Sequence, residues 1–201
     1  MLVTPPAVSV TEGCDLLATW ACQDSAGRGT WYLVPSAAGG RLFRKQGIRG
    51  FLEGVSPWAC AAGIDPSAAR VVSTLPLNPS GTAPHGPLLR PAFPEPRREG
   101  ASLRFAFDVP YELAIFRGHF PTVPIVPGAL LTGWVTELGR EHCGWQHGAS
   151  YATLLKFRRI VQPGLTYDLQ IEISGARSTL DFHIRLEGAT CALGTLSAGP
   201  A

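Results

Sequence analysis

The chain has 201 residues, of which 45% are hydrophobic and 16% charged, and its formal net charge is +2 at pH 7. This composition supports a folded core and excludes an extensively disordered chain. The balance of 17 basic and 15 acidic residues gives no reason to expect general nucleic-acid binding. The length suits one large domain or two small ones.

The first residues, MLVTPPAVSV, lack a basic region followed by an apolar stretch, so we expect no signal peptide. The apolar region from Val123 to Val135 is interrupted by proline and glycine and is too short to span a bilayer. The five cysteines contain no CxxC pair and no metal-like spacing, which indicates free or buried thiols in a reducing compartment. We therefore expect a cytoplasmic protein with no membrane span and no metal site.

The first half of the chain gives weak structural signals. The sequence GTWYLVP, residues 29–35, is apolar and aromatic between turn residues, which predicts a strand. Residues 40–54 place apolar side chains at roughly helical spacing, although the glycines among them weaken a helix. A second strand is predicted for ARVVSTLP, residues 69–76. Together these elements predict a small α+β subdomain over residues 1–92.

Residues 93–101 contain prolines and a charged cluster with no hydrophobic period, which predicts a linker. The following SLRFAFDVP alternates apolar and other residues, as a half-buried strand does. From Gly128 to about Glu141 the apolar positions indicate a helix that is apolar over most of its surface, and therefore buried. Four strand-like runs follow, separated by QPG, SGARS and EGA. A meander of strands around one buried helix is an α+β fold, predicted for residues 102–201.

The stretch FRGHFPTVPIVPG ends where this helix begins. Its prolines stiffen the chain, because each fixes φ and restricts the residue before it. The N–H of Gly128 and the helix dipole are suited to hold a carbonyl oxygen that gains negative charge. His119, nine residues earlier, is suited to act as a base near neutral pH. Such a pair fits removal of a proton α to a thioester; on spacing alone, a structural histidine remains an alternative.

FRGHFPTVPIVPGALL resembles the signature loop of the (3R)-hydroxyacyl-[acyl carrier protein] dehydratases of the FabZ/FabA type. LLTGWVTELGRE and LLKFRRIVQPGLTYDLQIEIS resemble the aryl-polyene, ApeI-like branch of that family. The resemblance covers residues 102–197 and implies a hotdog fold, in which an antiparallel sheet wraps a long central helix. It also implies a dimer and a substrate carried on the phosphopantetheine of an acyl carrier protein, with no cofactor of the chain's own.

The resemblance further implies roles for individual residues. His119 would abstract the α proton, and the N–H of Gly128 would bind the thioester carbonyl. Substrate-binding positions carried over from the family are Phe120, Pro121, Pro127, Gly133 and Trp134.

The sequence departs from the family at the acid. The family has a carboxylate fourteen residues after the histidine, but this position holds Gly133, although the expected Trp134 follows it. Thr122 also replaces the glycine usual after HFP. Glu137 lies one helical turn beyond Gly133 and is a candidate catalytic surrogate acting through a water. The alternative is that Glu137 is a solvated or salt-bridged helix residue.

ARVVSTLPLNPSGTAPHGPLL resembles the C-terminal subdomain of AMP-forming acyl or aryl ligases. Thr82 stands where those ligases have their lysine, so the resemblance implies the remnant of a fusion with no adenylation activity. The alternative is that NPSG is an ordinary turn.

Four basic residues form a candidate docking rim for an acidic acyl carrier protein: Arg117, Lys156, Arg158 and Arg159. The alternative is that these residues form a solvated strand end.

Three functions remain open from the sequence. The first is a 3-hydroxyacyl-thioester dehydratase whose acid catalysis is impaired at Gly133. The second is a non-catalytic hotdog partner or acyl-thioester-binding subunit, in a homodimer or a heterodimer. The third is a hotdog thioesterase.

Overall fold

The computed structural model describes residues 14–23, 30–73, 87–120, 122–145, 150–174 and 178–198. The chain divides into two compact units. The N-terminal unit consists of Met1–Leu89 and Pro110–Ile125, and the sheet unit consists of Arg90–Val109 and Val126–Ala201. The stretch Pro110–Ile125, called the His119 segment below, thus belongs to the N-terminal unit although β5 and α2, which flank it in sequence, lie in the sheet unit.

The N-terminal unit contains a three-stranded sheet of order β1-β2-β3, formed by Leu17–Gln23, Thr30–Pro35 and Ala69–Val71. β1 runs antiparallel to β2, whereas β2 and β3 are parallel. Parallel neighbours need a crossover connection, and here helix α1 supplies it. The predicted strands are present as β2 and a shorter β3, but β1 was not predicted.

Helix α1 (Ala37–Ala61) extends beyond the predicted residues 40–54 at both ends. Ser36 caps its start by accepting a hydrogen bond from the N–H of Gly39 at 3.1 Å. Gly47 has φ 71° and kinks the helix, a conformation that glycine adopts without steric cost. One face of α1 packs on the sheet in a core of Leu17, Leu33, Phe43, Phe51, Val55 and Val71. The short helix η1 (Pro66–Ala68) leads into β3.

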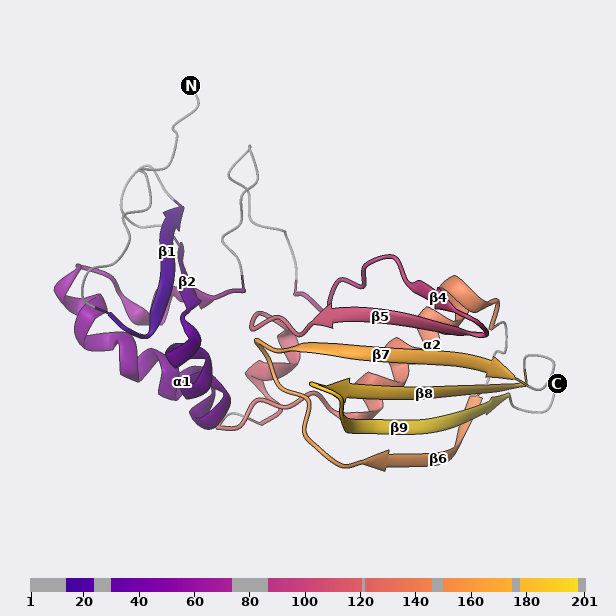
Figure 1. Ribbon diagram of the computed structural model, residues 1–201. Coiled ribbons are helices and arrows are strands. Elements are labelled where there is room, and N and C mark those ends of the chain that lie inside the picture. Colours follow the sequence, from indigo (N-terminus) through magenta and orange to yellow (C-terminus); the bar gives the residue numbers. More distant parts are fainter. Residues whose placement is uncertain are drawn as a thin grey trace, which may run out of the picture. The chain divides into compact units, whose positions relative to one another are not determined.

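The sheet unit is a six-stranded antiparallel sheet with helix α2 (Gly128–Cys143) behind it in Figure 1. The spatial order of the strands is β4-β5-β7-β8-β9-β6. Their bounds in this order are Arg97–Glu99, Ser102–Asp108, Thr166–Ser174, Thr179–Leu186, Ala189–Ala198 and Ser150–Phe157. The predicted α+β class, with one long helix against a large antiparallel sheet, is confirmed.

Alternation along the strands places the core between the sheet and α2. In β5 the side chains of Leu103, Phe105 and Phe107 are buried, whereas the residues between them are exposed. The buried residues of α2 are Leu131, Trp134, Val135, Leu138 and Gly139. The prediction that α2 is buried over most of its surface is wrong, because Ala129, Gly133, Glu137 and Arg140 form an exposed face.

Two features differ from the sequence predictions. The last four strands are not a simple meander, because β6 pairs with β9 at the far edge of the sheet and not with β7. Residues 93–101, expected to be a linker, contain edge strand β4, which pairs with β5. Phe93 also packs its ring on Phe107, with centroids 4.9 Å apart. A proline-rich stretch is compatible with the edge of a sheet, where a missing N–H breaks no ladder.

Among the described residues, no helix is both long and apolar enough to cross a membrane. Within the same residues, His, Cys, Asp and Glu side chains form no group of three or more that is arranged to hold a metal ion.

Candidate active site

His119 follows directly on the short helix η2 (Ala114–Arg117) and Gly118. Its backbone N–H donates to the carbonyl of Ile115 at 2.9 Å, and Gly118 donates to the same carbonyl at 3.2 Å. Phe116, within η2, is buried. The backbone at His119 is therefore fixed to a packed helical turn.

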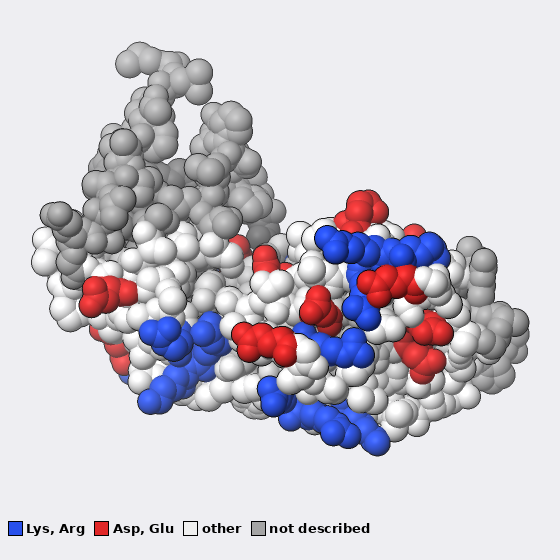
Figure 2. Space-filling view, in the orientation of Figure 1, with Lys and Arg blue, Asp and Glu red and all other residues white. Residues whose placement is uncertain are grey.

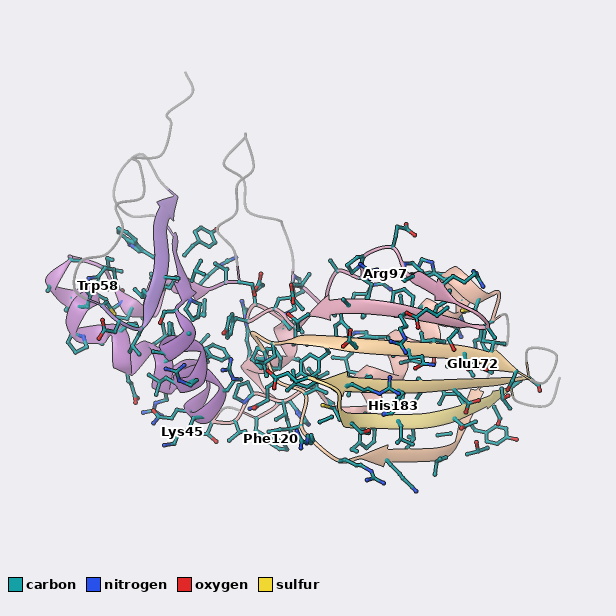
Figure 3. The ribbon with its side chains drawn as sticks, viewed as in Figure 1. Lys45, Trp58, Arg97, Phe120, Glu172 and His183 are labelled. Atoms are coloured by element: carbon teal, nitrogen blue, oxygen red, sulfur yellow. The ribbon has the colours of Figure 1, made fainter. Side chains whose placement is uncertain are left out.

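The ring of His119 keeps one nitrogen without a partner. Nδ1 is buried, and no described residue forms a hydrogen bond with it. The ring lies beside that of Phe120, with centroids 4.3 Å apart, and the peptide bond between the two residues is cis. Phe120 itself is 53% exposed and is labelled in Figure 3. Pro121, predicted to bind substrate, lies outside the described residues.

The start of α2 brings backbone amides to one point. Pro127 precedes the helix, and its carbonyl accepts hydrogen bonds from Leu130 at 3.0 Å and Leu131 at 3.1 Å. The amides of the first two residues, Gly128 and Ala129, precede these bonds and have no carbonyl partner within the helix. A Cβ on Gly128 would lie 2.5 Å from Cζ of Phe157, so glycine lets this aromatic ring approach the helix start.

A pocket of about 340 Å³ lies along the exposed face of α2, and we call it the Gly133 pocket. Its walls include Gly133, Thr136, Glu137 and Arg140 from α2 and Ala152 and Leu155 from edge strand β6. A Cβ on Gly133 would meet nothing within 4 Å. The position where the family has its carboxylate is therefore open space.

The two threonine hydroxyls of the Gly133 pocket are used within the helix. Thr132 Oγ1 donates to the carbonyl of Ala129 at 2.9 Å, and Thr136 Oγ1 donates to that of Thr132 at 2.8 Å. Both hydroxyl protons are therefore donated to backbone carbonyls of α2. Glu137 is thus the one carboxylate among the described residues that line this pocket.

Glu137 is held by a cation from a distant part of the sequence. Arg90 Nη1 donates to its Oε2 at 2.8 Å and also to Glu141 Oε1 at 3.1 Å. Hydrogen bonds to Glu141 and then Glu137 raise the pKa of the Arg90 guanidinium. The structure favours the salt-bridged alternative for Glu137, with Arg90 as the partner.

Trp134 is 3% exposed and packs its ring against Phe93, with centroids 6.2 Å apart. It does not line the Gly133 pocket. Its indole Nε1 is buried, with no hydrogen-bond partner among the described residues. This placement favours a core role, and substrate contact by Trp134 stays a prediction.

The predicted docking rim divides between the two units. Arg117 is the last residue of η2, in the N-terminal unit. Lys156, Arg158 and Arg159 are exposed at the end of β6, where the amides of both arginines donate to the carbonyl of Cys191. In Figure 2, Lys and Arg side chains gather along the edges of the sheet unit. The structure thus brings together three of the four predicted docking residues, and docking stays a prediction.

The candidate residues form two groups, each in its own unit. His119 and Phe120 belong to the N-terminal unit, whereas Gly128, Gly133 and Glu137 belong to the sheet unit. The sequence reasoning missed Arg90 and Phe157, because their contacts join residues far apart in the chain and leave no local signal. Thr82 and the NPSG stretch lie outside the described residues.

Known structures resemble a little over half of the chain. The dehydratase heterocomplex ApeI:P from Xenorhabdus doucetiae is 24% identical, with a TM-score of 0.51, over 56% of this chain and 100% of its own. An uncharacterized protein from Erwinia carotovora subsp. atroseptica is 20% identical, with a TM-score of 0.47, over 56% of this chain and 98% of its own. The first likeness shows the hotdog fold that the sequence predicted. No curated protein matches the sequence.

The family follows from the sequence of the chain's second half. Residues 95–195, half of the chain, match the model of the ApeI dehydratase. The matched range includes His119, Gly128 and the open position 133. The chain therefore belongs to the ApeI-like dehydratase family.

Proposed function

We propose that the chain dehydrates 3-hydroxyacyl thioesters, carried on the phosphopantetheine of an acyl carrier protein, to trans-2-enoyl thioesters. The observation that carries this proposal is the family match over residues 95–195, which contains the histidine loop and the helix start. In the proposed reaction His119 removes the α proton, the N–H of Gly128 binds the thioester carbonyl, and the β-hydroxyl leaves as water. Acid catalysis of that last step is impaired, because Gly133 replaces the carboxylate.

The surroundings of His119 support its role as the base. Imidazole exchanges its proton near neutral pH, and a base must have a nitrogen free to accept the substrate proton. Nδ1 has no hydrogen-bond partner among the described residues, and because it is buried, the ring or its surroundings must shift before a substrate proton reaches it. The hydrogen bond from the His119 N–H to Ile115 fixes the backbone, which limits the number of ring positions available.

The start of α2 supports the role proposed for Gly128. Amides of a first helical turn, together with the helix dipole, stabilise an oxygen that gains negative charge. Phe157 is packed close to Gly128 and excludes a side chain there. A backbone N–H is the polar group that Gly128 can offer to a thioester carbonyl.

The acid step is the weak point of this mechanism. Glu137 Oε2 accepts a hydrogen bond from Arg90 at 2.8 Å, so this oxygen can donate a proton to the leaving hydroxyl only if the pair opens. Loss of one general acid or base costs about 10²–10⁴-fold in rate. We therefore propose slow dehydration by the chain alone, with Glu137 as the surrogate to test.

A second candidate is a non-catalytic partner or acyl-thioester-binding subunit in a hetero-oligomer. The open position at Gly133 favours it, because the pocket persists while its acid is missing. Edge strand β6 also has exposed apolar side chains, namely Tyr151, Leu154, Leu155 and Phe157. Such an edge suits pairing with a strand of another subunit, a second copy or a different hotdog chain. The ApeI:P structure is described as a heterocomplex, which is consistent with this proposal.

The carrier-docking proposal concerns the basic residues at the end of β6. Acyl carrier proteins are acidic, and charge complementarity steers such partners. Arg158→Glu should weaken binding of the carrier protein, measured by titration at low salt. Unchanged binding would refute docking at this place.

The third candidate, a hotdog thioesterase, is supported by the fold alone.

The proposed function is tested by incubating the purified full chain with a 3-hydroxyacyl thioester on a carrier protein. Formation of the enoyl thioester supports the dehydratase. Binding without any product supports the non-catalytic subunit, and release of a free carrier thiol with the hydroxy acid supports the thioesterase. A chain that neither binds nor converts the substrate contradicts the proposal.

A further inference from the structure

The His119 segment is held by the N-terminal unit and not by the strand and helix that flank it in sequence. It groups with Met1–Leu89, although β5 and α2 belong to the sheet unit. Three contacts join this segment to the rest of the N-terminal unit. They involve the end of β3, Leu88 and helix α1, and they lie between residues 111 and 114, a few residues before His119.

The first contact joins the end of β3 to Glu112. Val72, directly after β3, donates to the carbonyl of Leu33 at 3.0 Å, which anchors this chain end in the sheet. The N–H and the hydroxyl of the next residue, Ser73, both donate to Glu112 Oε2 at 3.0 Å. Ser73 Oγ accepts in turn from the N–H of Tyr111 at 3.1 Å. Hydrogen bonds to a carboxylate are stronger than those between neutral groups.

The second contact joins Leu88 to the start of η2. Leu88 and Leu113 form a parallel bridge, and the N–H of Ala114 donates to the carbonyl of Leu88 at 2.9 Å. The side chain of Leu113 is 1% exposed and that of Phe116 is 4% exposed. The backbone pairing with Leu88 therefore joins the start of η2 to the N-terminal unit.

The third contact joins Tyr111 to α1. The rings of Tyr111 and Phe43 meet edge to face, with centroids 5.0 Å apart. A Cβ on Gly40 would lie 2.4 Å from the Tyr111 hydroxyl oxygen. The close approach of this tyrosine therefore depends on glycine at position 40.

The path ends at His119 through η2. The carbonyl of Ile115, within η2, accepts hydrogen bonds from Gly118 and from His119. Glu112 and Tyr111 are thus joined to the histidine by a short run of chain whose backbone is bonded at several points.

We propose that the N-terminal unit positions His119, with Glu112 and Tyr111 as the positioning residues that connect them. The proposal rests on the proposed function, in which His119 is the base. It gives the N-terminal unit a part in dehydration that does not depend on adenylation chemistry. The competing explanation is that the same contacts only stabilise the N-terminal unit.

The first experiment compares Glu112→Ala with Glu112→Gln and with Glu53→Ala in the full chain. Glu112→Ala removes both acceptor contacts to Ser73, whereas Glu112→Gln keeps an oxygen that can accept them. Glu53 is a matched control, since it is an exposed carboxylate of the same unit that pairs with Arg49. Amide exchange is measured at residues 114, 116, 118 and 119, whose N–H groups all donate hydrogen bonds.

We expect Glu112→Ala to speed exchange at these four amides about tenfold, because local opening becomes easier. In Glu112→Ala, exchange in β2 and α1 should stay within about twofold of the rate in the unchanged chain. In Glu112→Gln and Glu53→Ala, exchange at the four amides should also stay within about twofold of that rate. Unchanged exchange at the four amides overturns the proposal. Exchange that rises equally in α1 also overturns it, since the effect is then a general loss of stability.

Kinetics supply the second readout. Glu112→Ala should lower kcat about tenfold with KM nearly unchanged, and Glu112→Gln should restore kcat, because the base is misplaced while groups of the sheet unit are untouched. A chain that makes no enoyl product in any form refutes the proposed function. The exchange result then still decides whether Glu112 holds the His119 segment.

A second pair of variants covers the case in which Glu112→Ala does not fold. Gly40→Ala should displace Tyr111 and speed exchange at the four amides, because its Cβ would overlap the hydroxyl oxygen. Adding Tyr111→Phe removes that oxygen and leaves Arg44 Nη1 at 3.2 Å and Cζ at 3.6 Å from the Cβ. Exchange should slow again, because the end of the arginine side chain can move aside. No rescue by Tyr111→Phe would contradict a positioning role for Tyr111.

Discussion

The His119 segment and the exposed face of α2 differ in how each is prepared for acid–base chemistry. At His119 the backbone is hydrogen bonded and one ring nitrogen is unpartnered among the described residues. Along α2 the pocket is present, but Gly133 offers no functional group and Glu137 is paired with Arg90. Under the proposed function, the candidate base therefore has a bonded backbone, whereas the position proposed for the acid is open.

Replacement of His119 should have the largest effect. His119→Ala should lower the rate of enoyl formation about 10²–10⁴-fold, because no base remains to take the α proton. Single-turnover measurements with enzyme in excess can resolve the slow original rate. His183→Gln, in the sheet unit, is the control and should leave the rate unchanged. If His119→Ala retains the full rate, the base half of the comparison is wrong.

Alanine substitutions at two glycines of α2 test whether one face of the helix is open and the opposite face is packed. A Cβ on Gly139 would lie 2.4 Å from Leu180 Cδ1, whereas one on Gly133 would meet nothing within 4 Å. Gly139→Ala should therefore lower the free energy of unfolding by roughly 1–3 kcal/mol. Gly133→Ala should raise it by roughly 0.5–1 kcal/mol, because alanine favours a helix. Urea denaturation checks both, and equal effects would contradict the open pocket.

Sequence patterns predicted the sheet unit well, because each strand buries one face and alternation shows it. β5, β7 and β8 follow this pattern closely. The place of β6 at the far edge was not predictable, since alternation gives a strand its faces and not its neighbour. β1 was missed because LATWACQ has no clean alternation.

Parts of the candidate site were indicated by the sequence for a different reason. The proline-rich loop before an apolar helix indicated His119 and the helix start at Gly128, which the structure confirms for the helix. The resemblance to the family indicated the missing carboxylate at position 133, and the roles of these residues stay predictions. It could not indicate that Arg90 pairs with Glu137, because 47 residues separate them. Nor could it indicate that Ser73 holds Glu112, which is 39 residues away.

A comparison of Glu137 with Glu141 tests whether Glu137 takes part in proton transfer or only forms an ion pair with Arg90. Glu137 and Glu141 both accept from Arg90, but only Glu137 lines the Gly133 pocket. We expect Glu137→Gln and Glu141→Gln to lower stability by less than about 1 kcal/mol each, since both pairs are largely solvated. Enoyl formation should be equal in the two variants. Loss of turnover in Glu137→Gln alone would identify Glu137 as the surrogate acid.

His183 should give the smallest effect, on stability. It lies on the sheet face seen in front in Figure 3, away from α2. Arg185 donates to its Nδ1 at 2.6 Å, and Nε2 lies 2.8 Å from Thr190 Oγ1. Burial, and then the charge of Arg185, lower the pKa of His183 below its ordinary value of 6.5.

The folded chain therefore binds a proton at His183 less readily than the unfolded chain does. The resulting stability is fully present above the unfolded pKa and is lost as the pH falls through the folded pKa. His183→Gln should flatten the dependence of unfolding free energy on pH below 6.5. An unchanged slope in urea denaturation would show that His183 contributes nothing to it.

The most direct test of the account restores the acid. Gly133→Glu places a carboxylate in open space, and Gly133→Gln provides a side chain of the same shape that cannot transfer a proton. The two variants and the original chain are compared for enoyl formation from a 3-hydroxyacyl thioester on a carrier protein. We predict at least about a tenfold gain for Gly133→Glu and none for Gly133→Gln. Equal rates in all three would contradict the claim that the site keeps its base and lacks only its acid.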